Sequence, residues 1–136
     1  MQRLDERAAV IAGWMTKADN DLTTALQTLK LGKKAPTDTI CFHAQQCIEK
    51  SLKAALVYLG IHFPRTHDLS VLSALLPKEY KGWMSPKEQE QMTDYAVTSR
   101  YPGDYLPITL KQTRQAVSVA RRVRKTICRL IPCDIF

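Results

Sequence analysis

Apolar residues recur with the period of an α-helix along every long segment of the chain. Between Leu4 and Leu29 they follow alternating steps of four and three residues without a break, which is typical of a helix that packs into a bundle. A second pattern of this kind runs from Ile40 to Leu59, and Gly60 follows it as a C-terminal stop. The pattern indicates two long, consecutive amphipathic helices in the first half of the chain.

Proline and capping residues mark where these helices begin and end. Pro36 forbids continuation of the first helix, and either Thr37 or Asp38 can cap the second. Thr66 is the expected N-cap of a short third helix that carries leucines to about residue 76, with Asp68 in its first turn, where the helix dipole favours an acid.

Two further helices complete the chain. The sequence Ser-Pro-Lys-Glu at 85–88 has the chemistry of a capping box and starts a fourth helix, which is expected to run to about Ser99. Two prolines and a glycine within 100–107 break it, and a final long helix spans about 107–131. Short connections imply antiparallel neighbours. The sequence therefore predicts an all-α, up-and-down bundle of four long helices plus one short helix, in a single domain over residues 1–136.

Length and composition agree with one globular domain. The chain has 136 residues, of which 45% are hydrophobic and 24% charged, which is close to the globular average and argues against disorder. No apolar run approaches the ~20 residues of a membrane span. The first residues lack the pattern of a secretory signal. We therefore expect a cytoplasmic protein with no membrane partner.

The formal charge is +7, and the excess is concentrated near the C-terminus. Seven basic residues and no acid lie in the last predicted helix: Lys111, Arg114, Arg121, Arg122, Arg124, Lys125 and Arg129. Such a cluster suggests nucleic acid, a nucleotide or an acidic protein surface as partner. A solvated helix face that only keeps the protein soluble is the alternative.

Few residues suit metal or nucleophilic chemistry. The four cysteines, Cys41, Cys47, Cys128 and Cys133, do not have the spacing of a zinc or redox motif, so reduced, structural thiols are expected. The chain has no glycine-rich phosphate loop, no nucleophile elbow and no zinc-binding helix motif. No metal and no cofactor is expected, apart from a nucleotide ligand.

Two segments carry candidate binding residues. His43, Gln46, Lys50 and Lys53 follow helical steps of three, four and three, so they form a polar stripe that can offer charge and directed hydrogen bonds to an anion. The alternative is an inter-helix polar edge, with Glu49 and Lys53 as an ordinary ion pair. In the loop after the fourth helix, Arg100 and Tyr101 suit a phosphate with a stacked base, unless that loop is only a structured turn.

The sequence resembles the HEPN (higher eukaryotes and prokaryotes nucleotide-binding) domain family. Four segments carry the resemblance: Trp14, Ala18 and Asp21-Leu22 in the first helix, FHAQQCIEKSLKAAL at 42–56, PRTHDL at 64–69, and Tyr95 through Arg100-Tyr101-Pro102. The resemblance implies an α-helical bundle that commonly forms a homodimer. It also implies a partner of the minimal nucleotidyltransferase type, in a toxin–antitoxin or stress module. Arg65 and His67 lie in the third of these segments, and they join the candidate phosphate-binding residues.

Some members of the family are metal-independent ribonucleases that carry an arginine and a histidine separated by four to six residues. This chain departs from that motif, because no histidine follows His67 in the sequence. At the required spacing from Arg100 the chain instead has Tyr105, Leu106 and Pro107. A phenol with an ordinary pKa near ~10 is a poor base at neutral pH. The resemblance therefore implies a non-catalytic module that binds a nucleotide or RNA phosphate and a protein partner. A divergent ribonuclease toxin and a purely protein-binding dimeric scaffold remain the alternatives.

Overall fold

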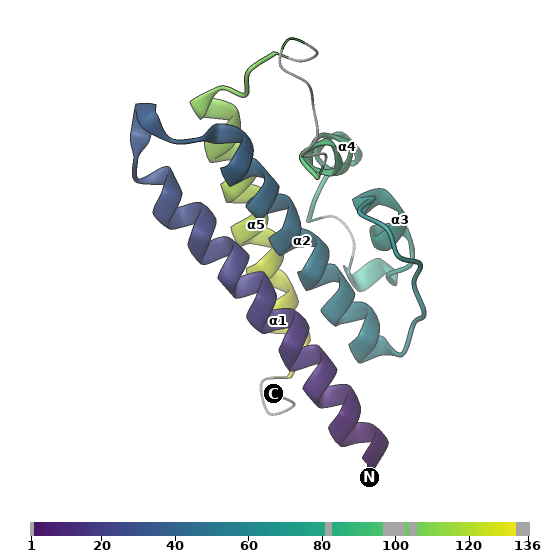
Figure 1. Cartoon of the computed structure of the whole chain (residues 1–136). Coiled ribbons are helices and arrows are strands. Elements are labelled where there is room, and N and C mark those ends of the chain that lie inside the picture. The colour runs from purple at the N-terminus through teal and green to yellow at the C-terminus, as the bar shows by residue number, and fades with distance from the viewer. Residues whose placement is uncertain (1, 81–82, 97–102, 104–105, 133–136) are drawn as a thin grey trace.

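The computed structural model describes residues 2–80, 83–96, 103 and 106–132, and within them the chain forms helices and no strand (Figure 1). The five α-helices of this part of the chain are α1 (Gln2–Leu29), α2 (Thr37–Leu59), α3 (Leu69–Ala74), α4 (Pro86–Asp94) and α5 (Leu110–Leu130). Short 3-10 helices occupy Gly32–Lys34 and Lys78–Tyr80. The predicted all-α bundle is confirmed.

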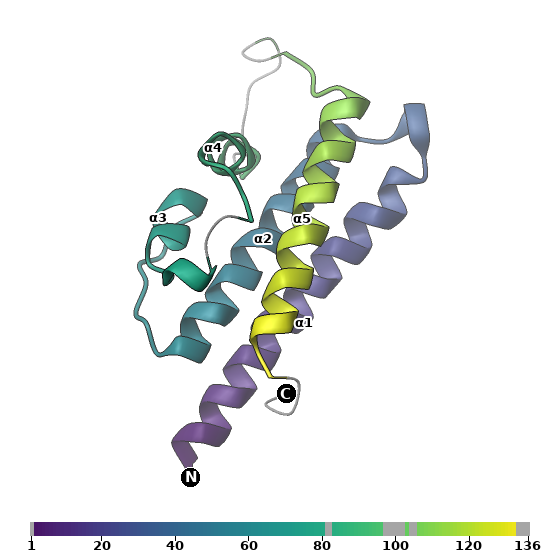
Figure 2. The same cartoon turned by 180° about the vertical axis from the view of Figure 1, so that it is seen from behind.

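Helix α2 is the central element of the bundle. It runs antiparallel to α1, and α5 packs against this pair on the side that faces the viewer in Figure 2. The shorter helices α3 and α4 pack against each other beside α2. As a result α2 has neighbours on three sides, and every one of its residues from Cys47 to Leu56 except Lys50 is buried. Polar side chains at those positions need partners inside the bundle.

The main core joins all five helices. Its largest fully buried members include Ile11 and Met15 of α1, Ile48 of α2, Leu69 of α3 and Ile127 of α5. A smaller cluster of Ala25, Ile40 and Val117 closes the opposite end of the α1–α2–α5 unit. The 3–4 spacing seen in the sequence thus reflects real burial in the two long N-terminal helices.

The start of α4 follows the predicted chemistry, and the starts of α2, α3 and α5 differ from it. Ser85 and Glu88 form the expected capping box of α4. Helix α5 begins at Leu110 instead of near residue 107, after a capping box at Thr109 that was not predicted. In contrast, Pro36 is the N-cap of α2 and no side chain caps it, so neither Thr37 nor Asp38 has the predicted role. The fixed backbone angle of proline favours this start without a cap.

The N-cap of α3 is Asp68, and the prediction of Thr66 was wrong. The Asp68 carboxylate accepts from the backbone N–H of Ser70, whereas the Thr66 hydroxyl accepts from the N–H of Asp68 itself. Two consecutive side-chain turns therefore lead into the helix. Because α3 begins after Asp68 and not after Thr66, His67 lies in the connecting loop, where it contacts α2.

Helix α4 ends at Asp94, which is earlier than the predicted end near Ser99. Ser99 itself lies outside the described residues. At the end of α2, Gly60 adopts a left-handed conformation with φ of 71° and donates to the carbonyls of Leu56 and Val57, as the expected stop requires. Within the described part of the chain, no helix has the length and apolar character of a membrane span.

The described cysteines are free thiols. Cys41 and Cys47 are completely buried, and burial raises the pKa of the Cys41 thiol to about 11 and that of Cys47 to about 12. These thiols pack as small apolar groups, which agrees with the expected structural role. Cys128 is half-buried on α5, and Cys133 lies outside the described residues.

Candidate functional site

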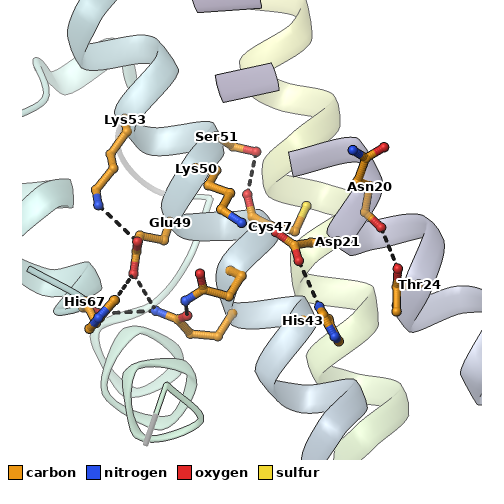
Figure 3. Close-up of polar contacts among 12 residues, drawn as sticks. Asn20, Asp21, Thr24, His43, Cys47, Glu49, Lys50, Ser51, Lys53 and His67 are labelled. Carbon is orange, nitrogen blue, oxygen red and sulfur yellow. Dashed lines mark hydrogen bonds and ion pairs between the residues drawn. The ribbon is translucent and has the colours of Figure 1, made fainter. Parts of the chain in front are cut away.

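The polar side chains of α2 form two separate clusters, one toward α1 and one toward α3 (Figure 3). Each cluster has a carboxylate at its centre, and each carboxylate binds one histidine and one lysine. The predicted single stripe of His43, Gln46, Lys50 and Lys53 is therefore divided between two neighbourhoods.

The first cluster joins α1 to α2 through Asp21. One oxygen of this carboxylate lies 2.8 Å from Nδ1 of His43, and the other lies 2.5 Å from Nζ of Lys50. The Asp21 side chain is 11% exposed, so a cation beside it is needed to offset the loss of hydration. Lys50 supplies that charge. The Lys50 ammonium is therefore already paired with an acid of its own chain and is less available to an external anion.

The second cluster is centred on Glu49, whose side chain is only 4% exposed. Its carboxylate accepts from Lys53 Nζ at 3.0 Å, from His67 Nδ1 at 2.8 Å and from Gln45 Nε2 at 3.3 Å. Gln45 also donates to the backbone carbonyl of His67 and accepts from Gln46. These bonds fix the loop before α3 to the middle of α2.

Lys53 is enclosed by aromatic rings as well as by its acid. Its ammonium lies 5.3 Å from the ring centroid of Trp14 on α1 and 6.0 Å from that of Phe63 in the α2–α3 connection. Both distances are within the range of cation–π attraction. The predicted Glu49–Lys53 pair at spacing i, i+4 is confirmed, and it is a buried pair instead of a surface one.

The most exposed candidate residues among those described, Arg65 and His67, lie in the α2–α3 connection. The His67 side chain is 68% exposed although Glu49 holds its Nδ1. Because the carboxylate accepts at Nδ1, the second ring nitrogen, Nε2, is left at the surface with no hydrogen-bond partner among the described residues. Arg65 is exposed two positions earlier. A protonated imidazole fixed in this way, together with the guanidinium of Arg65 in the same connection, can bind an oxyanion.

The other candidate residues differ in accessibility. His43 and Gln46 are half-buried on α2. Arg100 and Tyr101 lie outside the described residues, as does Tyr105. The structure therefore brings His43 together with Lys50, and Gln46 together with Lys53 and His67.

Sequence reasoning missed Asp21 and Gln45 as members of these clusters. Asp21 falls between Ala18 and Ala25 on the apolar stripe of α1, at steps of three and four. An acid on a buried stripe requires a cationic or donor partner from a facing helix. That position was the available signal, and it points to Lys50 and His43 as the nearest basic groups on the polar side of α2.

The basic side chains of helix α5 fall into two groups, those that form ion pairs with described residues and those that do not. Arg122 binds Glu88 of α4 through two hydrogen bonds of 2.8 and 2.9 Å, and Arg124 binds Asp19 of α1 at 2.7 and 3.0 Å. Burial opposes ionisation of Glu88, but the bond from the Ser85 N–H and the Arg122 guanidinium together lower its pKa. The remaining five are exposed, with no ion pair among the described residues: Lys111, Arg114, Arg121, Lys125 and Arg129.

The described residues include no group of three or more histidine, cysteine, aspartate or glutamate side chains placed to hold a metal ion. The two clusters on α2 instead combine carboxylates with cationic groups, which satisfy each other. These internal pairs fix the positions of the side chains that they join.

Comparison with known proteins identifies similar chains. The HEPN domain family matches residues 11–131. Among solved structures, ST0689, an archaeal HEPN homologue, is 25% identical with a TM-score of 0.67, over 90% of this chain and 98% of that one. The protein TT1696 from Thermus thermophilus is 23% identical with a TM-score of 0.72, over 89% of this chain and 98% of that one. The search of curated proteins gave no match.

Proposed function

We propose that this chain, which belongs to the HEPN domain family, is a non-catalytic module that binds the phosphate of a nucleotide or RNA and pairs with a protein partner. The observation that carries the proposal is the exposed His67 imidazole, whose Nδ1 is held by buried Glu49 while Arg65 stands exposed in the same connection. When the ring is protonated, its Nε2–H is an orientated donor, and together with the Arg65 guanidinium of the same connection it offers a preorganised contact for an oxyanion.

The remaining candidate residues have two kinds of role in the proposal: some position His67, and others are further contacts for the ligand. Lys53 and Gln46 position His67 through Glu49 and Gln45, since their own polar groups are already bonded. Lys50 and His43 form a second, partly exposed edge on Asp21. Arg100 and Tyr101 are proposed as further ligand contacts on the basis of the family resemblance.

The partner proposed is a nucleotidyltransferase-type protein, with the HEPN chain as a homodimer in a toxin–antitoxin or stress module. Its support is family membership alone. Co-expression with the product of an adjacent nucleotidyltransferase gene, followed by affinity purification and size-exclusion chromatography with light scattering, tests both the pairing and the dimer.

Calorimetric titration with ATP, GTP and a short RNA tests the phosphate site. We expect the wild type to bind at least one of these ligands, and the double variant Arg65→Ala, His67→Ala to bind it at least about tenfold more weakly, as for the loss of a charge-assisted contact. His62→Ala is the matched control, because His62 is exposed in the same connection and takes part in no described hydrogen bond. Circular dichroism verifies that each variant is folded.

Equal affinity in wild type and double variant, or no binding by either, would remove the phosphate-binding role. Cleavage of the RNA during the titration, if abolished by His67→Ala alone, would instead establish the ribonuclease alternative. In that case the Glu49-held imidazole acts as the general base, since its free nitrogen faces solvent.

A further inference from the structure

The outer face of α5 carries a row of five basic side chains that form no ion pair with the described residues. Its members occur at steps of three, seven, four and four residues, which place them on one side of a helix: Lys111, Arg114, Arg121, Lys125 and Arg129. Ser118, also exposed, occupies the gap between the second and third. Their side of the helix lies opposite the buried positions Thr113, Ala116, Ala120, Val123 and Ile127. We call this row the α5 cationic face.

Two acids of the described residues bond to arginines of α5 that lie outside this row. Asp19 is bonded to Arg124 and Glu88 to Arg122, both through two hydrogen bonds, and α5 itself contains no acid. These pairs use the two arginines at the edges of the helix. The five residues of the α5 cationic face are therefore left available to an external anion.

A shallow groove runs along this face at the border between α1 and α5. It has a volume of about 440 Å³ and is lined by Leu22, Arg121, Arg122, Arg124, Lys125 and Cys128. The guanidinium of Arg124 is held rigidly on the groove wall by Asp19. Arg121 and Lys125 add positive charge that no described acid pairs, and a concave surface with excess positive charge concentrates the electrostatic field and attracts an extended anion.

The shape and composition of the face indicate which anion it fits. Large apolar side chains that are exposed in the described residues, Val10, Leu31, Val71, Leu75 and Leu106, all lie outside α5. The centre of a specific protein interface is enriched in apolar and aromatic side chains, and the α5 cationic face presents no large exposed one. From Lys111 to Arg129 the helix rises roughly 27 Å, which spans several successive phosphates of a nucleic-acid strand.

We propose that the α5 cationic face is a binding surface for the phosphodiester backbone of a single-stranded nucleic acid. Its residues contact phosphates along the helix, and the groove beside Arg124 receives part of the strand. Contacts of this kind are independent of base sequence. This surface is separate from the Arg65–His67 phosphate site, so either can be present without the other.

Fluorescence anisotropy with labelled oligouridylate tests this surface. The wild type is expected to bind with an affinity that falls as salt rises from about 50 to 200 mM, with a log–log slope near about −3.5 for five phosphate contacts on a single strand. Arg121→Glu, Lys125→Glu should weaken binding by about tenfold or more and bring the slope to about −2. Lys33→Glu, Lys34→Glu changes the net charge equally at an exposed 3-10 helix outside the α5 cationic face and should leave affinity within about twofold.

Further arms fix the identity of the ligand. Equal affinity for oligouridylate and oligothymidylate supports recognition of the shared backbone, and a preference for one identifies the natural strand without changing the surface.

Equal losses in the two charge-reversal variants, or absence of binding by the wild type, would overturn the proposal. Displacement of the strand by polyglutamate of equal charge and length at equal concentration would also overturn it, in favour of an acidic protein. The Arg121→Glu, Lys125→Glu variant should bind ATP or GTP as the wild type does, which separates this result from that of the mononucleotide titration.

Discussion

The buried Glu49–Lys53 pair can be tested by replacing its acid with the isosteric amide. Glu49→Gln keeps the size of the side chain and an oxygen that accepts from His67, but it removes the negative charge beside Lys53. Lys53 is almost as buried as its partner, with 11% of its side chain exposed. The substitution therefore leaves a buried ammonium without its counter-charge.

The magnitude follows from three opposing effects. Removing one partner of a buried ion pair commonly lowers the free energy of unfolding by about 3–5 kcal/mol. The amide oxygen can still accept from Lys53, and the faces of Trp14 and Phe63 continue to attract the ammonium. Each of these contacts recovers roughly 1 kcal/mol. We therefore expect Glu49→Gln to lower the free energy of unfolding by about 2 kcal/mol.

A double-mutant cycle with Lys53→Met isolates the charge interaction. Lys53→Met alone leaves Glu49 with donors from Gln45 and His67 only, and should also lower the free energy of unfolding by about 2 kcal/mol. The double variant holds no unpaired charge, so we expect it to lose about 2 kcal/mol in total and not about 4. Urea unfolding followed by circular dichroism gives all four values. A loss below about 0.5 kcal/mol for Glu49→Gln, or single effects that simply add, would refute the reasoning.

Two further predictions concern ionisation at other sites. Alkylation by iodoacetamide at pH 8, read residue by residue by mass spectrometry, should modify half-buried Cys128 much faster than Cys41 or Cys47, because burial raises the pKa of those thiols to about 11 and about 12. Comparable rates in the folded protein would contradict their burial. The pKa of Glu88 is lowered in the folded protein from 4.5, so its pairing with Arg122 stabilises the fold above that value and is lost as the pH falls through the lower folded-state pKa. Arg122→Gln should therefore be less stable than wild type at pH 7 and approach it in thermal melts at acid pH, whereas a pH-independent difference would exclude this linkage.

The helices of this chain were predictable because their cores follow a simple period. The alternating steps from Ile11 to Ala25 in α1 correspond to buried positions, with the exception of half-buried Leu22. Local capping chemistry also specified the start of α4 at Ser85. The start of α3 was misplaced, because Thr66 and Asp68 both have side chains that accept from a nearby N–H, and the choice depends on how Leu69 packs.

The site was less predictable than the helices. The spacing of residues predicts which side chains share one face of a helix, but it does not predict which other helix packs against that face. The spacing of Lys50 and Lys53 correctly gave a polar edge on α2. It could not show that Lys50 meets Asp21 on α1 while Lys53 meets Glu49 and an aromatic enclosure. Pairing of this kind is set by the packing of three elements together. The exposed site residue, His67, was recovered through family resemblance and not through spacing.

The shared carboxylate of Asp21 also has a consequence for how the chain tolerates changes in length. It binds His43 and Lys50, which are seven residues and about two turns apart on α2, so it fixes the axial alignment of α1 against its neighbour. A one-residue insertion between Asp21 and the end of α1 would rotate the carboxylate by roughly 100° away from both groups. An insertion at Gly32, in the hairpin connection, would leave that alignment intact. Natural variation in the length of this hairpin should therefore occur in the connection and not in the helices.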